Sequence, residues 1–194
     1  MKERPILFTG PMVRAILEGR KTVTRRVVTP QPDFLGSMVD PNTPFKTLDA
    51  GLHARITCPY GQPGDRLWVR EAWAADAQVD AIAPSDLSQG EPIWYPADLS
   101  VRQTGCSMIS KGRVRPSIHM PRWACRILLE ITAVRVERLQ DISDPGALAE
   151  GVSHSEMHSG DSLVDVFARL WESTGGDWAA NPWVWVLEFK RVTP

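Results

Sequence analysis

The alternation of apolar and polar residues along the chain predicts most of its strands. The two clearest alternations cover residues 127–139 and 182–191. A shorter one covers residues 66–70, directly after the turn signal Pro63-Gly64-Asp65, and the β-branched stretch at 22–28 is also typical of extended chain. Since strands dominate this pattern, the chain belongs to a mainly β class.

Helical periodicity is limited to three short segments. One helix is predicted from Gly10-Pro11 to Gly19, after a short strand at residues 7–9. Ser143 is a good N-cap for a short helix that ends at Gly151. An apolar stripe within residues 161–171 predicts the third helix, which begins at Asp161 or Ser162.

Two long segments interrupt this pattern. Residues 29–62 and 76–122 are rich in turn-forming residues, and we expect them to be loop-rich insertions, with one short strand at 93–95. Strands with few helices and long connections indicate a single α+β domain over residues 1–194. The expected architecture is a small β-barrel with helices packed at its ends.

Composition and charge limit the function classes. Hydrophobic residues make up 43% of the chain and charged residues 23%, as in ordinary globular proteins. The net charge of −1 excludes binding to nucleic acid through a global basic field, so any such contact needs a local patch of arginines. The eight tryptophans suit a core, and they also suit stacking on a planar ligand.

Nothing in the sequence predicts a disulfide framework, a metal site or a membrane segment. The three cysteines are scattered, and the histidines have no metal-like spacing with them or with one another. No apolar run has membrane length, and the start does not resemble a signal peptide. We therefore expect a cytoplasmic protein with reduced thiols, no metal and no membrane partner.

The most reactive stretch is residues 19–26, Gly-Arg-Lys-Thr-Val-Thr-Arg-Arg, which holds two hydroxyls and four cations. A desolvated lysine among other cations has a lowered pKa and can take the proton of a threonine hydroxyl. Lys21 and Thr24 are three residues apart, so joint action requires a turn or bulge near Thr22. The alternative is a solvated basic strand edge.

Five motifs together resemble the ASCH superfamily, whose fold is PUA-like. They cover roughly half of the chain, in the family's order. The motifs are Leu-Glu-Gly-Arg-Lys-Thr at 17–22, Pro-Gly-Asp with Leu-Trp-Val at 63–69, the strand 127–136, Ala-Leu-Ala-Glu-Gly at 147–151, and the strand 184–189. Residues 116–123 also resemble ASCH proteins that are commonly encoded by phages and prophages.

The resemblance implies a PUA-like barrel that accepts nucleosides or RNA. Some small members are amidohydrolases that remove the acyl group from N4-acetylcytidine without a metal or cofactor. Their catalytic lysine, threonine and glutamate match Lys21, Thr24 and Glu150. Other members bind RNA or modified bases, or act as ribonucleases, so this remains the alternative. Two features depart from the small amidohydrolases: the insertions are longer, and Arg25 replaces an aliphatic residue.

Further residues are candidates for contacts with a nucleoside or with RNA. Cations and a stacking ring near a possible cleft suit a base or a phosphate, and a histidine bonds a base edge. These substrate-binding candidates are Arg20, Arg26, Arg70, His119 and Trp123. The carboxylates that rival Glu150 for the acidic role are Glu71, Glu137 and Glu188.

Overall fold

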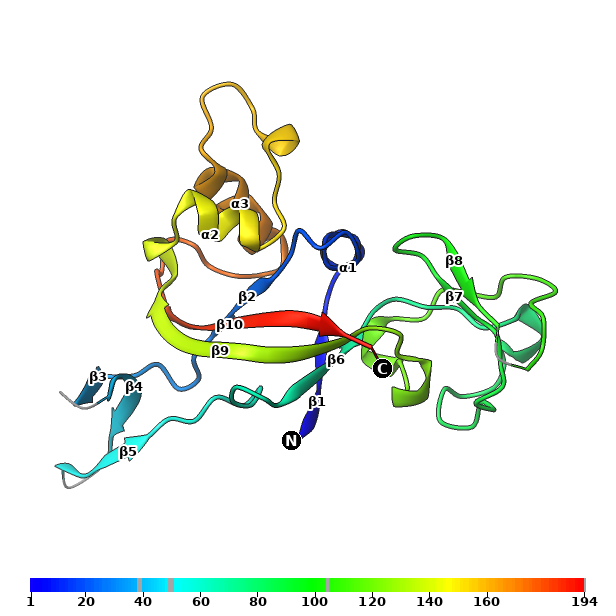
Figure 1. Ribbon diagram of the computed structural model, residues 1–194, viewed down its shortest axis with the longest axis horizontal. Helices are drawn as coiled ribbons and strands as arrows, with labels where there is room; N and C mark the ends of the chain where they lie inside the picture. The colour runs from blue at the N-terminus through cyan, green and yellow to red at the C-terminus, as the bar shows by residue number, and fades with distance from the viewer. Residues whose placement is uncertain (38–39, 49–50, 104, 194) are drawn as a thin grey trace. The chain divides into compact units, whose positions relative to one another are not determined.

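The protein is described by a computed structural model over residues 1–37, 40–48, 51–103 and 105–193 (Figure 1). Its elements, in chain order, are β1 (Glu3–Leu7), α1 (Gly10–Leu17), β2 (Val23–Val27), β3 (Phe34–Ser37), β4 (Asp40–Thr47), β5 (His53–Arg55), β6 (Arg66–Arg70), η2 (Ala77–Val79), β7 (Ile93–Tyr95), β8 (Ser100–Arg102), η3 (Ser117–His119), η4 (Arg122–Ala124), β9 (Leu128–Arg138), η5 (Leu139–Asp141), α2 (Asp144–Ala149), η6 (His154–Glu156), α3 (Leu163–Ser173) and β10 (Trp183–Val192). The expected fold class, mainly β with flanking helices, is confirmed by these elements.

The contacts within the chain define two compact units. Unit 1 comprises residues 1–18, residues 66–130 and the C-terminal residues from Arg191. Unit 2 comprises residues 19–65 and 131–190. The main sheet has the strand order β1-β6-β9-β10-β2, in which β9 and β10 each run through both units. The expectation of a single domain over the whole chain stays a prediction.

Among the described strands, the main sheet is not closed into a barrel. Its order begins at β1 and ends at β2, and β1 has β6 as its neighbour, in parallel register. Ile6 is the buried residue of β1, while its other residues are exposed or partly exposed. Such an alternation shows that one face of β1 is covered and the other faces solvent, while the strand order places β1 at an edge of the sheet. The strand also lies earlier than the predicted 7–9, because Thr9 already serves as the N-cap position of α1.

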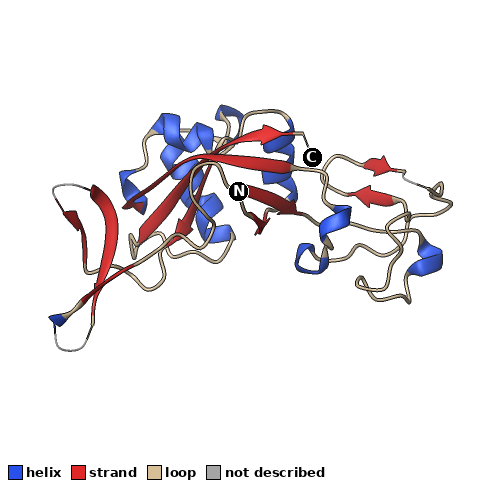
Figure 2. Ribbon diagram, turned by 60° about the horizontal axis from the view of Figure 1, so that its bottom comes forward, coloured by secondary structure: helices blue, strands red, loops and turns tan. Residues whose placement is uncertain are grey.

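In unit 1, β6 has the expected alternation. Leu67 and Val69 are buried, while Arg66, Trp68 and Arg70 are partly exposed on the opposite face. The segment that follows is mostly loop with short helical turns and the β7–β8 hairpin (Figure 2). Its hydrophobic cluster contains Trp73, Ala75, Leu87, Ile93, Tyr95, Met120 and Ala124.

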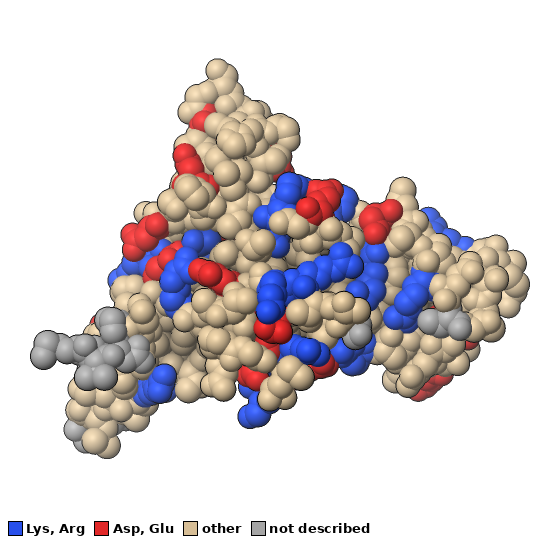
Figure 3. All heavy atoms as spheres, in the orientation of Figure 1, with Lys and Arg blue, Asp and Glu red and all other residues tan. Residues whose placement is uncertain are grey.

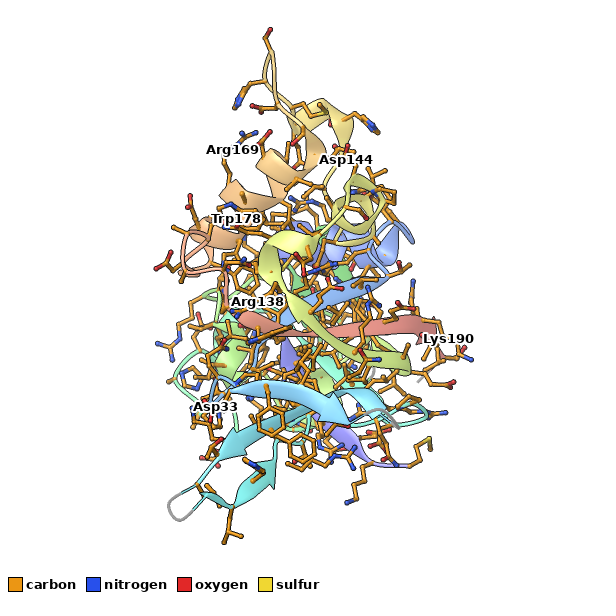
Figure 4. All side chains as sticks on the ribbon, turned by 90° about the vertical axis from the view of Figure 1, so that its left-hand side faces the viewer. Asp33, Arg138, Asp144, Arg169, Trp178 and Lys190 are labelled. Carbon is orange, nitrogen blue, oxygen red and sulfur yellow. The ribbon has the colours of Figure 1, made fainter. Side chains whose placement is uncertain are left out.

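In unit 2, the helices α2 and α3 pack together beside β2 (Figure 1). Ser143 caps α2, and Ser162 forms a capping box with Asp165 at the start of α3. The core contains residues from β2, from the segment 139–152 that includes α2, from α3 and from β10. They are Val23, Leu139, Ile142, Ala147, Val152, Leu163, Val166, Phe167, Val184 and Val186. Trp178, labelled in Figure 4, packs its ring edge-on at 6.1 Å from the ring centroid of Phe167.

Residues 29–62 contain more regular structure than we expected. β3, β4 and β5 form a three-stranded antiparallel sheet within this segment. The rings of Phe34 and Phe45 stack at 5.5 Å across the strands, and Asp33 (Figure 4) accepts hydrogen bonds from the Lys46 ammonium and the Thr47 amide. Such cross-strand pairs stabilise a sheet but leave no mark on local composition, which here is dominated by turn formers.

Gly19 ends α1 with a left-handed backbone conformation, at φ +75°. A Cβ built there meets no atom within 4 Å, so Gly19→Ala tests backbone strain alone. We expect this substitution to lower the free energy of unfolding by about 1–2 kcal/mol in urea titrations. Gly90 is the matched control, because it has no positive φ and its built Cβ meets only Ser88 Oγ at 3.6 Å. Equal effects of Gly19→Ala and Gly90→Ala would contradict the assignment.

Candidate active site

The segment that follows α1 is held by backbone hydrogen bonds of Thr22 to α2 and to β10. The Thr22 amide donates a 2.9 Å hydrogen bond to the carbonyl of Ala149, the last residue of α2. The Thr22 carbonyl accepts a 2.9 Å bond from the Phe189 amide of β10. These two bonds place Lys21, which lies just before β2, beside the C-terminal end of α2.

Lys21 is the most deeply buried charged side chain of this region, with 0% of the side chain exposed. Its Nζ donates to the carbonyl oxygens of Val23 and Glu150, both at 2.8 Å, and to Glu150 Oε2 at 2.5 Å. Burial lowers the pKa of Lys21 below the ordinary 10.5, and the charges of Arg26 and Arg25 lower it further, whereas Glu150 opposes the change. The neutral amine is therefore more accessible than in an ordinary lysine.

Glu150 is the C-cap residue of α2, and its carboxylate binds two cations. One carboxylate oxygen accepts from Lys21, and the other, Oε1, accepts from Arg25 Nη1 at 3.1 Å. A carboxylate at a helix C-terminus meets the negative end of the helix dipole, so this position is unfavourable without compensation. Here the compensation comes from Lys21 and Arg25, and the side chain of Glu150 is 4% exposed.

Arg25 contacts this site directly, although the candidate site residues chosen from the sequence did not include it. Its Nε and Nη2 both donate to Glu137 Oε1, at 3.0 and 2.6 Å, and its side chain is 2% exposed. A Cβ on Gly146 of α2 would lie 3.3 Å from Arg25 Nη2, so the glycine permits this close approach of the helix. The departure of Arg25 from the aliphatic residue of the small amidohydrolases was the available signal in the sequence.

The charges continue towards the surface as an alternating series. Glu137 Oε2 accepts from Arg135 Nε at 3.2 Å, and Arg135 Nη1 in turn donates to Glu188. Glu137 and Glu188, two of the rival carboxylates, thus belong to this series. On the face drawn in Figure 3, lysines and arginines are similarly interspersed with acidic residues. Charges of both signs are therefore arranged in pairs around the site.

Thr24 lies in β2, opposite Leu187 of β10, and is buried. Neighbouring strand residues point to opposite faces, so Thr24 and Arg25 lie on different faces of β2, while Arg26 shares the face of Thr24. The carbonyl that Lys21 binds belongs to the Val23–Thr24 peptide bond, which brings the amine next to the Thr24 backbone. The hydrogen bonds described for Lys21 and Glu150 do not include the Thr24 hydroxyl.

The structure brings some of the substrate-binding candidates to this site and places others in unit 1. Arg20 donates to the carbonyl of Gly151 at 2.7 Å, next to Glu150. Arg26, in β2, lies opposite Trp185 of β10. Arg70, His119 and Trp123 all belong to unit 1.

Within unit 1, these three candidates have different surroundings. Arg70 donates to the carbonyls of Met120 and Ile118 and stacks on Trp68, with 5.2 Å to the ring centroid. His119 is exposed at the end of η3. Trp123 packs against the unit 1 core, so its ring has a structural role there.

The third rival carboxylate, Glu71, is also in unit 1. Both of its oxygens accept from Arg126, at 2.8 and 2.9 Å, and burial raises the pKa of this carboxyl against the opposing effect of Arg126. The Arg126 guanidinium also bonds Asp98 and lies over the Tyr95 ring. This cluster ties the loop-rich segment of unit 1 to the end of β6.

No group of three or more His, Cys, Asp or Glu side chains in the described part of the chain is placed to hold a metal ion. No helix within the described ranges is both long and apolar enough to cross a membrane. The expectations of a metal-free reaction and of a cytoplasmic location stay predictions.

Comparisons with known proteins gave one structural match. No protein-family model matches the chain, and no curated protein matches it. The fold is similar to that of the ASCH domain from Lactobacillus crispatus JV V101. The match covers 100% of this chain and 81% of that chain, with 13% identity and a TM-score of 0.42.

Proposed function

We propose that the protein is a metal-independent amidohydrolase that removes the acyl group from N4-acylated cytosine nucleosides such as N4-acetylcytidine. The observation that supports this proposal best is the environment of Lys21. Its side chain is buried and its pKa is lowered by that burial, while its Nζ contacts Glu150 and the carbonyl of the Val23–Thr24 peptide bond. A lysine that loses its proton readily is the base that an unactivated hydroxyl requires.

In the proposed reaction, neutral Lys21 takes the proton of the Thr24 hydroxyl as Thr24 Oγ1 attacks the acyl carbon. The tetrahedral intermediate collapses with cleavage of the C–N4 bond, and the proton passes from Lys21 to the leaving N4, which gives the free nucleoside. Water then hydrolyses the acyl-threonine to the carboxylic acid and restores the hydroxyl. Glu150 orients Lys21, and Arg26, on the Thr24 face of β2, stabilises the oxyanion.

An RNA-binding or modified-base-binding module is the second candidate function. It is favoured by Trp68 of unit 1, whose ring is contacted by the guanidinium groups of Arg70 and Arg122, at 5.2 and 5.9 Å from the ring centroid. Aromatic rings beside arginines are typical of surfaces that stack single-stranded bases. Binding without hydrolysis, weakening steeply with salt, would support this function instead.

The deciding experiment is incubation with N4-acetylcytidine and measurement of cytidine and acetate release by chromatography. We expect Thr24→Val to fold normally, because valine keeps the branched shape, and to abolish measurable hydrolysis, because the oxygen that attacks the acyl carbon is gone. Thr132→Val is the matched control, since Thr132 is exposed in β9 and should tolerate the same change. Full activity of Thr24→Val on all acylated cytidines, or no hydrolysis by the unmodified protein, would refute the proposal.

A further inference from the structure

The series of charges around Glu150 assigns a function to Arg25. Resting on the proposed hydrolase function, we propose that Arg25 is a positioning residue that holds the Glu150 carboxylate in place and offsets its charge, so that Lys21 can release its proton. Arg25 does not touch the reacting atoms in this scheme. It acts on Lys21 through Glu150.

The geometry of Arg25 suits this role. Its guanidinium is anchored on one side by two hydrogen bonds to Glu137 Oε1, and on the other side Nη1 binds Glu150 Oε1. The ring of Phe167 lies 5.8 Å from the guanidinium carbon, so an apolar side chain of α3 covers it. A planar guanidinium held in this way fixes the orientation of the Glu150 carboxylate. The other oxygen of this carboxylate, Oε2, then faces Lys21.

The charge of Arg25 has a separate effect on the lysine. A lone buried carboxylate at 2.5 Å would stabilise the protonated amine strongly, which would make Lys21 a poor base at neutral pH. A second cation on the same carboxylate shares its negative charge and repels the ammonium directly. Arg25 is accordingly among the groups that lower the pKa of Lys21, after burial and Arg26.

Other charged groups also surround Lys21 and Glu150. From β2, Arg26 also lowers the Lys21 pKa. From β9, Glu137 and Arg135 continue the series, and β10 adds Glu188. Arg25 is the member of this series that binds Glu150 directly from β2, so its replacement should change Lys21 most among the non-catalytic groups.

The test measures Lys21 itself and does not depend on activity. The chain has five lysines (Lys2, Lys21, Lys46, Lys111 and Lys190), so an NMR titration of the side-chain Cε signals is tractable with ¹³C-labelled lysine. The signal that disappears in Lys21→Met identifies Lys21. In Arg25→Met we expect the pKa of Lys21 to rise, because the carboxylate then acts on the lysine without a competing cation.

The conservative variant and the control sharpen this result. Arg25→Lys keeps the positive charge but loses the planar guanidinium with its several N–H donors, so it should raise the Lys21 pKa less than Arg25→Met does. Arg135→Gln, at a side chain that is 39% exposed and separated from Glu150 by Arg25 and Glu137, should leave both the Lys21 pKa and the activity unchanged.

Activity provides a second readout. A neighbouring charge moves a pKa by roughly one to three pH units, so kcat/KM of Arg25→Met at pH 7 should fall about tenfold or more and recover at higher pH. A merely structural role would lower the rate at all pH values without moving the acidic limb of the profile.

The outcomes separate the two proposals. An unchanged Lys21 pKa in folded Arg25→Met would overturn the role of Arg25, even if the protein hydrolyses N4-acetylcytidine. If Arg25→Met does not fold, as judged by circular dichroism, an unchanged Lys21 pKa in Arg25→Lys would overturn it instead. A raised Lys21 pKa in a protein without hydrolase activity would support the action of Arg25 on Lys21 and refute the hydrolase function.

Discussion

Replacement of Lys21 by methionine is expected to lower kcat/KM for N4-acetylcytidine by about 1,000-fold, within the range of roughly 10²–10⁴-fold that a general base contributes. Methionine fills a similar volume without a charge, and Glu150 keeps its contact with Arg25, so the carboxylate remains paired. The loss should therefore come from the missing amine. Cytidine release under identical conditions measures the effect.

Lys46→Met provides the matched control for this experiment. Lys46 belongs to the same unit, and its ion pair with Asp33 is partly exposed, so its removal should leave the rate unchanged. The pH profile adds an internal check, because the rate of the unmodified protein should rise with pH as Lys21 loses its proton. Burial lowers the Lys21 pKa, so this rise should lie below pH 10.5. A Lys21→Met protein within tenfold of the unmodified rate would eliminate Lys21 as the base.

Replacement of Glu150 by leucine is expected to have the largest effect on stability, a loss of about 3–5 kcal/mol in the free energy of unfolding. The carboxylate is the direct partner of two buried cations, Lys21 and Arg25. Without it, the Lys21 ammonium is left buried with only carbonyl acceptors among the bonds described above, and Arg25 keeps only Glu137. Urea titration followed by circular dichroism measures the loss.

Glu188→Leu is the control for this second prediction. Glu188 also forms an ion pair, with Arg135, but its side chain is 41% exposed. An exposed pair contributes about 0–1 kcal/mol, so this variant should remain close to the unmodified protein. Similar losses of stability in Glu150→Leu and Glu188→Leu would show that burial is not the reason why the ion pairs of Glu150 stabilise the fold.

Much of the fold could be predicted from local pattern. The alternations at 66–70, 127–139 and 182–191 correspond to β6, β9 and β10, and the apolar stripe at 161–171 corresponds to α3. These predictions succeed because a strand or helix with one buried face carries the period of its own geometry. The sheet of β3, β4 and β5 was not predicted, because its stabilising contacts join residues of different strands, such as Phe34 and Phe45.

The candidate site, too, could be predicted only in part from the sequence. Lys21 and Glu150 could be named from the sequence by their motifs, and the unfavourable place of Glu150 at a helix end was a physical signal for a partner. The sequence could not show that Arg25 and Glu137 complete the cluster. Arg25 lies 112 residues from Glu137 and 125 residues from Glu150, and nothing in a local pattern encodes such a contact.

By itself, the sequence determined the mainly β class and the capped helices, and it pointed to Lys21 as the candidate base, since each depends on neighbouring residues. Only the tertiary structure decided that Lys21 is buried against Glu150, that Arg25 shares this carboxylate, and that Thr24 faces away from Arg25 on β2. The physical reason is desolvation. The pKa of Lys21 depends on which groups exclude water from it and which charges lie beside it, and those groups come from α2 and β2, which are far apart along the chain.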